Sequence, residues 1–280
     1  MIRREIQFPG EELQWLLISQ LEHARISGEL AAAAIRHFPS RFQDDSSEPI
    51  VRARAEIVRT IVRHDDGWAQ WEAWPGLDDE GRPPAFTEMP QDDAIEIWTG
   101  CADEAERLGP LAAFMVSSHF LALLERSREK STPAAEAWLK KYEPLRDEWR
   151  EQWYDQHPGQ VDSWIPEEAL HWLQDYDLMS LWLCLRAPIG GEVRESWPEP
   201  YTVSDERGVV LSAQRSSETA SQVTLQQATV EVRPWRYLKP MVLAVNAHLV
   251  PQKRYRDTKE LMSARRPTRL LFRLVPPASS

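Results

Sequence analysis

The spacing of apolar residues divides the chain into a helical part and a strand-rich part. In "IVRARAEIVRTIVRH", Ile50, Ile57 and Ile61 recur at helical spacing, and similar patterns continue to about residue 187. Beyond that point, segments such as "QVTLQQATVEVRPW" and "MVLAVNAHLV" are rich in β-branched residues that partly alternate with polar ones. The pattern therefore predicts helices first and antiparallel strands afterwards.

The helical part contains several predicted elements separated by Pro- and Gly-containing segments. The run "LQWLLIS", residues 13–19, predicts a short strand, and the following helix is expected over residues 20–37. Further helices are predicted over residues 50–64, 92–108, 110–130, 133–156 and 165–185. Residues 75–90 are expected to form a loop. Gly67 is expected to adopt a left-handed backbone conformation that ends the helix predicted over residues 50–64.

Composition and charge exclude several classes of protein. The net charge of −11 and the pI near 5.2 disfavour binding to a nucleic-acid polymer, although a small anionic substrate in a locally positive pocket remains compatible. The apolar run "PLAAFMVSSHFLALL" is too short to span a bilayer, and "MIRREIQF" has no signal-peptide core. We therefore expect a cytoplasmic protein with no membrane partner, whose oligomeric state the sequence leaves open. Cys101 and Cys184 are expected to be inert buried thiols.

Polar side chains occur on the apolar faces of four predicted helices. His64, His119 and Asp177 each have apolar residues three, four or seven positions away, whereas His23 lies in an alanine-rich helix with mixed neighbours. An ionised carboxylate buried without a partner costs roughly several kcal/mol, so Asp177 needs a cation or several hydrogen-bond donors. A lone buried histidine is more often held by hydrogen bonds in a core. Convergence of these groups, with Asp65 beside His64, would instead build a metal site.

The order of these residues resembles a known signature. His23, the consecutive pair His64 and Asp65, and the late Asp177 resemble the ligands of the HD-domain superfamily of metal-dependent phosphohydrolases. In that fold these positions hold one divalent metal. Over nearly its whole length, including "QLEHARISGELA" and "DYDLMSLWLCL", the chain also resembles a family of uncharacterised bacterial proteins of unknown function.

The resemblance implies a fold and a set of ligands. The expected fold is mainly α, with an HD-like helical bundle over residues 1–190 and a C-terminal antiparallel β-rich extension, residues 191–280, packed on it. His119 is an additional inward histidine, and superfamily members with extra histidines can hold two metals. A second extra histidine would have to be His157 or His171, and neither lies in a suitable register.

The expected ligands define the chemistry. Imidazole and carboxylate ligands suit Mn, Fe, Ni, Co or Zn, as one or two ions, and such a metal activates water for hydrolysis of a phosphoester. Asp66 is a candidate general base, and a solvated carboxylate at a helix end is the alternative interpretation. Arg25 and Arg63 are candidate contacts for an anionic substrate, although such arginines more often form surface ion pairs.

Three functions are compatible with these residues. The leading hypothesis is a metal-dependent hydrolase of a small phosphoester, such as a nucleotide. The first alternative is an HD-type di-iron oxygenase, which depends on His119. The second is a non-catalytic protein in which a metal staples the helical part and the strand-rich part binds a partner.

Overall fold

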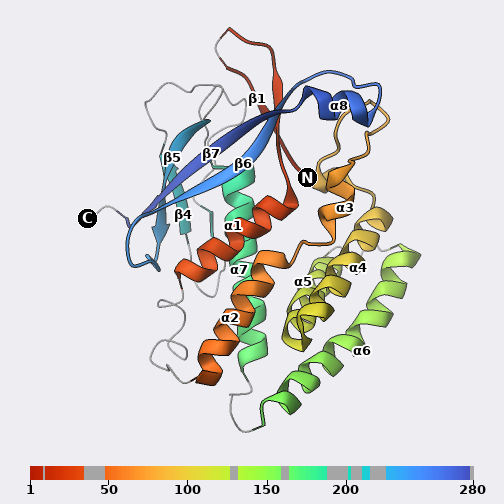
Figure 1. Ribbon diagram of the computed structural model, residues 1–280, viewed down its shortest axis with the longest axis vertical. Coiled ribbons are helices and arrows are strands. Elements are labelled where there is room, and N and C mark those ends of the chain that lie inside the picture. The colour runs from red at the N-terminus through yellow and green to blue at the C-terminus, as the bar shows by residue number, and fades with distance from the viewer. Residues whose placement is uncertain are drawn as a thin grey trace. The chain divides into compact units, whose positions relative to one another are not determined.

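The structure is a computed structural model that describes residues 1–8, 10–34, 48–126, 132–158, 164–187, 201–202, 210–214 and 225–277. Its helices are α1 (Gln20–Ala33), α2 (Glu48–Arg63), α3 (Trp68–Ala73), α4 (Gln91–Leu108), α5 (Pro110–Arg126), α6 (Pro133–Gln156), α7 (Ile165–Leu185) and α8 (Thr258–Ala264), with a 3₁₀ turn at Phe86–Glu88. Its strands are β1 (Ile2–Ile6), β2 (Gln14–Ile18), β3 (Tyr201–Thr202), β4 (Val210–Gln214), β5 (Leu225–Arg233), β6 (Met241–Pro251) and β7 (Arg266–Val275). Figure 1 labels most of these elements along the chain.

The chain divides into two compact units that are interleaved in sequence. Unit 1 comprises Met1–Ile26, Glu72–Glu88 and Leu178–Ser280, and unit 2 comprises Ser27–Trp71 and Met89–Asp177. The divisions fall inside the continuous helices α1 and α7. Unit 1 therefore holds the strands, and unit 2 holds most of the long helices.

Unit 1 is built around one seven-stranded sheet. The strand order is β1-β2-β6-β7-β5-β4-β3, and β6 pairs with β7 along most of its length (Figure 1). Alternation of buried and more exposed residues in β6 places Leu243, Val245, Ala247 and Leu249 on one face. Arg25 on α1 donates a hydrogen bond to the backbone carbonyl oxygen of Ala244 on this strand.

The sheet corrects the expected fold class. The prediction of a mainly α, HD-like bundle with a C-terminal antiparallel β extension is wrong, because β1 and β2 from the N-terminus belong to the same sheet as the C-terminal strands. In addition, β5 and β7 pair in parallel. The error has a physical cause. The apolar pattern reports which face of a strand is buried, but pairing between strands more than 200 residues apart leaves no local signal.

Unit 2 is organised around α5. Every residue from Leu111 to Leu121 on this helix is buried, and α5 packs against α2, α4 and α6. A helix that is buried on all sides lies at the centre of a helical unit. The helix α2 is amphipathic and buries Ile50, Ile57 and Ile61. The C-terminal residues of α2 and the central residues of α5 therefore point into the interior.

Several local predictions are confirmed, and one is wrong. The strand and helices predicted up to residue 185 match β2, α1, α2, α4, α5, α6 and α7 where the structure describes them. Residues 35–37 and 127–130, at the ends of two predicted helices, lie outside the described residues. Gly67 does not have a positive φ. Its small size is needed instead, because a Cβ atom there would clash with the backbone of Ile97 and Cys101 on α4.

Among the helices in the described part of the chain, none combines the length and the apolar character required to span a membrane.

Candidate metal centre

His64 lies in the turn directly after α2, and its ring orientation is fixed by the backbone. Its Nδ1 atom lies 2.8 Å from the carbonyl oxygen of Ile61, and its side chain is only 1% exposed. Because a carbonyl oxygen can only accept, Nδ1 carries the proton. In a neutral ring the lone pair is then on Nε2, and Nε2 points away from α2 into the interior.

The Nε2 atom of His64 faces two carboxylates. It lies 3.2 Å from Oδ1 of Asp177 on α7 and 3.6 Å from Oδ2 of Asp65. A lone pair directed at carboxylate oxygens is electrostatically unfavourable in a buried site. The arrangement is favourable only if a proton or a metal cation lies between these atoms.

The two carboxylates near Nε2 raise the pKa of His64. Burial by itself lowers the pKa, but the negative charge of Asp65 and the hydrogen bond and charge of Asp177 outweigh it and raise the pKa to about 9. The metal-free protein therefore holds a proton on Nε2 at neutral pH. Because a metal ligand must be deprotonated, a bound metal takes the place of that proton.

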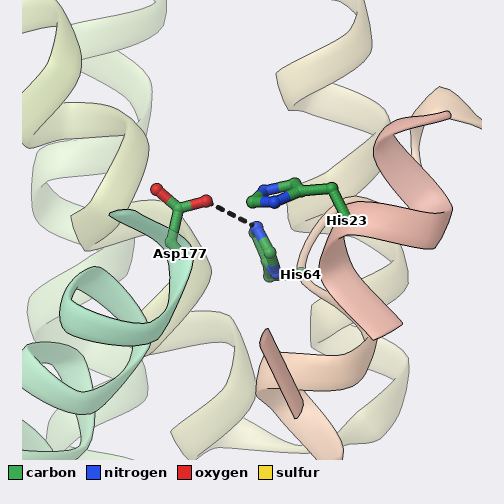
Figure 2. A group of neighbouring side chains, drawn as sticks. All are labelled: His23, His64 and Asp177. Atoms are coloured by element: carbon green, nitrogen blue, oxygen red, sulfur yellow. Dashed lines mark hydrogen bonds and ion pairs between the residues drawn. The ribbon is translucent and has the colours of Figure 1, made fainter. Parts of the chain in front are cut away.

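His23 on α1 completes a group of three. Potential ligand atoms of His23, His64 and Asp177 all lie within 4.8 Å of one another, and all three side chains are buried. Figure 2 shows the three side chains pointing toward one another, with the interaction between Asp177 and His64 marked by a dashed line. This group could hold a metal ion.

A buried hydroxyl orients His23. The Oγ atom of Ser180 on α7 is hydrogen-bonded to Nδ1 of His23. With Nδ1 held by Ser180, Nε2 is the nitrogen with which His23 would bind a metal ion. Ser180 was not predicted from the sequence. Its position three residues after Asp177, on the same helical face, is the signal that would have found it.

The structure places the other predicted ligands beside this group. Asp65 lies next to Nε2 of His64, and His119 has its Nε2 atom 3.8 Å from Oδ2 of Asp177. The rings of His64 and His119 meet edge to face, with centroids 6.0 Å apart. The five predicted metal ligands are thus in one region. Among the described residues, only His23, His64 and Asp177 have potential ligand atoms that all lie within 4.8 Å of one another.

The two predicted catalytic residues are held elsewhere. The Oδ2 atom of Asp66 lies 2.6 Å from Nε of Arg63, and both side chains are partly exposed. Arg25 makes an ion pair with Glu22, with an N to O distance of 2.6 Å, and also donates to Ala244 on β6. Neither side chain belongs to the buried group. Their proposed catalytic roles stay predictions.

Comparison with protein families gives one match. The family described as a protein of unknown function (DUF3891) matches residues 1–252 of the 280-residue chain. No curated protein and no solved structure shows a significant match. The resemblance to the HD-domain superfamily therefore stays a prediction.

Proposed function

The chain belongs to the DUF3891 family of proteins of unknown function, and we propose that it binds one divalent transition metal and hydrolyses a small phosphoester. One observation carries the metal part of this proposal. The Nδ1 proton of His64 is committed to Ile61, while Nε2 of the same ring faces Asp177 at 3.2 Å. This geometry favours a positive charge between Nε2 of His64 and Asp177, which a proton supplies in the metal-free protein and a metal ion would supply in its place.

The ligand types indicate the class of metal. Two imidazoles and one carboxylate, with Asp65 nearby as a fourth, favour Mn, Fe, Co, Ni or Zn over Mg and Ca, which prefer oxygen ligands. Three or four protein ligands also leave coordination positions for water and a substrate oxygen. A metal bound there supplies a water of lowered pKa and polarises a phosphoryl oxygen.

The chain itself orients the two histidine rings and buries the group of ligands. The Ile61 carbonyl oxygen fixes His64, and Ser180 fixes His23, so that both rings present Nε2 without further rearrangement. The group is buried in a region of low dielectric, where charge interactions with a substrate are stronger than in water. The net charge of −11 over the whole chain favours a small substrate over a nucleic-acid polymer.

The proposal is tested by metal reconstitution. The full chain is stripped with a chelator, refilled separately with Mn, Co, Ni or Zn, and assayed on p-nitrophenyl phosphate and on a panel of nucleotides. We expect metal-dependent turnover in the wild type and its loss in Asp177→Ala and His64→Ala. Turnover that is independent of metal and equal in the wild type and both variants would contradict the proposal.

A structural metal centre is a second candidate function. The observation that favours it is burial: the side chain of His64 is 1% exposed, and that of Asp177 is 8% exposed. In that case metal removal lowers the melting temperature, and no phosphoester is hydrolysed by the refilled protein. The same reconstitution experiment therefore separates the two functions.

The oxygenase alternative has less support. It requires a second ion beside His119, and within the described residues one group has suitable ligand spacing. Elemental analysis of the native protein tests it directly, because about two irons per chain would be found.

A further inference from the structure

Over β5, β6 and β7 the sheet of unit 1 has one buried face and one face that is open to solvent. The buried face of β6 and β7 consists of apolar residues that are at most 2% exposed: Leu243, Val245, Ala247, Leu270, Phe272 and Leu274. The residues that alternate with them, at even positions 242–248 and odd positions 267–275, are exposed or only partly buried. On the other side of β7, β5 adds Thr229, Glu231 and Arg233 to this second surface (Figure 1). We call it the open face.

The open face carries positive charges that are not paired with carboxylates. Three exposed arginines on it form no ion pair or side-chain hydrogen bond within the part of the chain that the structure describes: Arg233, Arg269 and Arg273. Glu231 is the one acidic side chain among the residues of this face. Glu22 contacts Asn246 at its edge, but Glu22 is already paired with Arg25. The open face therefore presents an excess of accessible cations.

The charge of this region is opposite to that of the chain as a whole. Residues 225–277 contain 11 Lys and Arg residues and 3 Asp and Glu residues, which gives a net charge of +8. The whole chain has a net charge of −11. A solvated face is ordinary in a sheet with antiparallel strands, but a local excess of one sign of charge attracts partners of the opposite sign. The open face is thus complementary to an anionic surface.

Two exposed aliphatic side chains border these cations. Val242 is 55% exposed and lies directly opposite Arg273 in the register of β6 and β7. Leu238, in the segment that joins β5 to β6, is 64% exposed, and Lys239 beside it is also exposed. Proteins that bind the surface of a bilayer combine these two kinds of side chain. The cations meet anionic headgroups, and the apolar groups enter the boundary between the headgroups and the acyl chains.

Other polyanions match the open face less well. Proteins that bind single-stranded nucleic acid supply aromatic rings on which bases stack. Trp235 is partly buried and Tyr237 is buried, and the described positions of the open face contain no Phe, Trp or Tyr. An interface with a protein has its apolar residues at the centre and its charges at the rim. Here Leu238 and Val242 lie at one end of the strands, where β6 begins.

We propose that the open face is a peripheral docking surface for a membrane that contains anionic phospholipid. Arg233, Arg269 and Arg273 contact the headgroup phosphates, and Leu238 and Val242 enter the headgroup boundary. This proposal departs from the expectation of no membrane partner. That expectation rested on the lack of an apolar span and of a signal peptide, neither of which a peripheral contact requires. The surface uses none of the three grouped residues of the candidate metal centre, so its test is independent of the proposed function.

The proposal is tested by sedimentation of the full chain with lipid vesicles. Vesicles of phosphatidylcholine alone are compared with vesicles of equimolar phosphatidylcholine and phosphatidylglycerol. We expect binding to the anionic vesicles to be at least about ten-fold tighter, and to weaken as salt is added, because salt screens the attraction. Equal binding to both kinds of vesicle, or binding to neither, would overturn the proposal.

Two soluble polyanions separate a membrane from other partners. Poly-L-glutamate represents an acidic protein segment, and a single-stranded DNA oligonucleotide represents nucleic acid. Fluorescence anisotropy measures the binding of each at the same salt concentration. We expect both to bind at least about ten-fold more weakly than the anionic vesicles, because neither has an acyl layer for Leu238 and Val242 to enter. Tighter binding of either polyanion would overturn the assignment to a membrane.

Matched variants locate the surface. The combined change of Arg233, Arg269 and Arg273 to Gln is expected to weaken vesicle binding by about 100-fold. The control changes three arginines of unit 2 to Gln and alters the net charge equally: Arg107, Arg146 and Arg150, which are all in ion pairs. If the first variant does not fold, Leu238→Ser at an exposed position is expected to weaken binding by at least about three-fold. Equal effects of the test and control variants, or unchanged binding in Leu238→Ser, would overturn the assignment.

Discussion

The Nδ1 atom of His64 is hydrogen-bonded to the carbonyl oxygen of Ile61, three residues earlier, at 2.8 Å. This bond decides which nitrogen of the ring faces the interior. It directs Nε2 at Asp177, and the local structure of one helix end therefore creates a position that a proton or a metal cation must occupy.

The first prediction concerns metal content. Native protein is expected to carry about one divalent transition metal per chain, and His64→Ala is expected to lose it, because Nε2 of His64 faces both nearby carboxylates. Inductively coupled plasma mass spectrometry after gel filtration measures this ratio. His171→Ala is the control, because His171 is 49% exposed and lies beside Glu168 on the surface of α7. Equal metal loss in both variants would indicate nonspecific binding.

The second prediction concerns pH. In the metal-free protein the pKa of His64 is raised from 6.5 to about 9, so protonation of His64 stabilises the folded state fully below pH 6.5. That contribution, on the order of 3 kcal/mol, is lost as the pH rises from 6.5 through 9. Urea unfolding of the chelated protein at several pH values measures the slope. Bound metal is expected to remove the slope, since it replaces the proton.

A control for this pH effect is Asp177→Asn, which removes one of the two carboxylates that raise the pKa of His64. The loss of stability between pH 6.5 and 9 is expected to become smaller in this variant. A slope that is unchanged in Asp177→Asn would show that another group is responsible.

The third prediction concerns Ser180. Ser180→Ala removes the hydrogen bond to Nδ1 of His23 and is expected to weaken metal binding by about ten-fold, as is usual for groups that orient a metal ligand. Competition with a fluorescent chelator measures the affinity. Ser117→Ala is a matched control, because Ser117 is also a buried helical serine, and its hydroxyl donates to Ala113 on its own helix. Equal affinity in the two variants would contradict a role for Ser180.

The fourth prediction separates the roles of two neighbouring aspartates, Asp65 and Asp66. Asp65→Asn is expected to lower metal affinity, because its carboxylate lies 3.6 Å from Nε2 of His64. Asp66→Asn is expected to leave metal affinity within about two-fold, because Asp66 pairs with Arg63 outside the buried group. A loss of kcat in Asp66→Asn at unchanged metal content would support the general-base role that the sequence suggested.

The fifth prediction concerns the turn that contains Asp65, Asp66 and Gly67. Gly67→Ala is expected to destabilise the protein by about 1–3 kcal/mol, because the added methyl group would clash with α4 at Ile97 and Cys101. Gly76→Ala is the control, since a Cβ atom there has open space. Chemical denaturation of both variants measures the difference. A stable Gly67→Ala protein would show that α4 can move away.

The periodicity of apolar residues predicted the long helices but not the short elements β1, α3 and α8. It predicted α2, α5 and α7 and showed that His64, His119 and Asp177 point inward, because burial repeats with the period of the helix. It also placed Asp65 beside the buried histidine. The same local information could not distinguish a glycine needed for its positive φ from one needed for close packing, and the prediction for Gly67 was wrong for that reason.

Only the tertiary structure decided which distant segments meet. The pairing of β2 with β6, and the parallel pairing of β5 with β7, depend on contacts between segments that are far apart in the chain. The role of Ser180 is of the same kind, because it depends on a histidine contributed by another helix. The sequence indicated that the polar side chains of His64, His119 and Asp177 are buried. Their distances depend on how the helices and strands pack, and no local pattern encodes those distances.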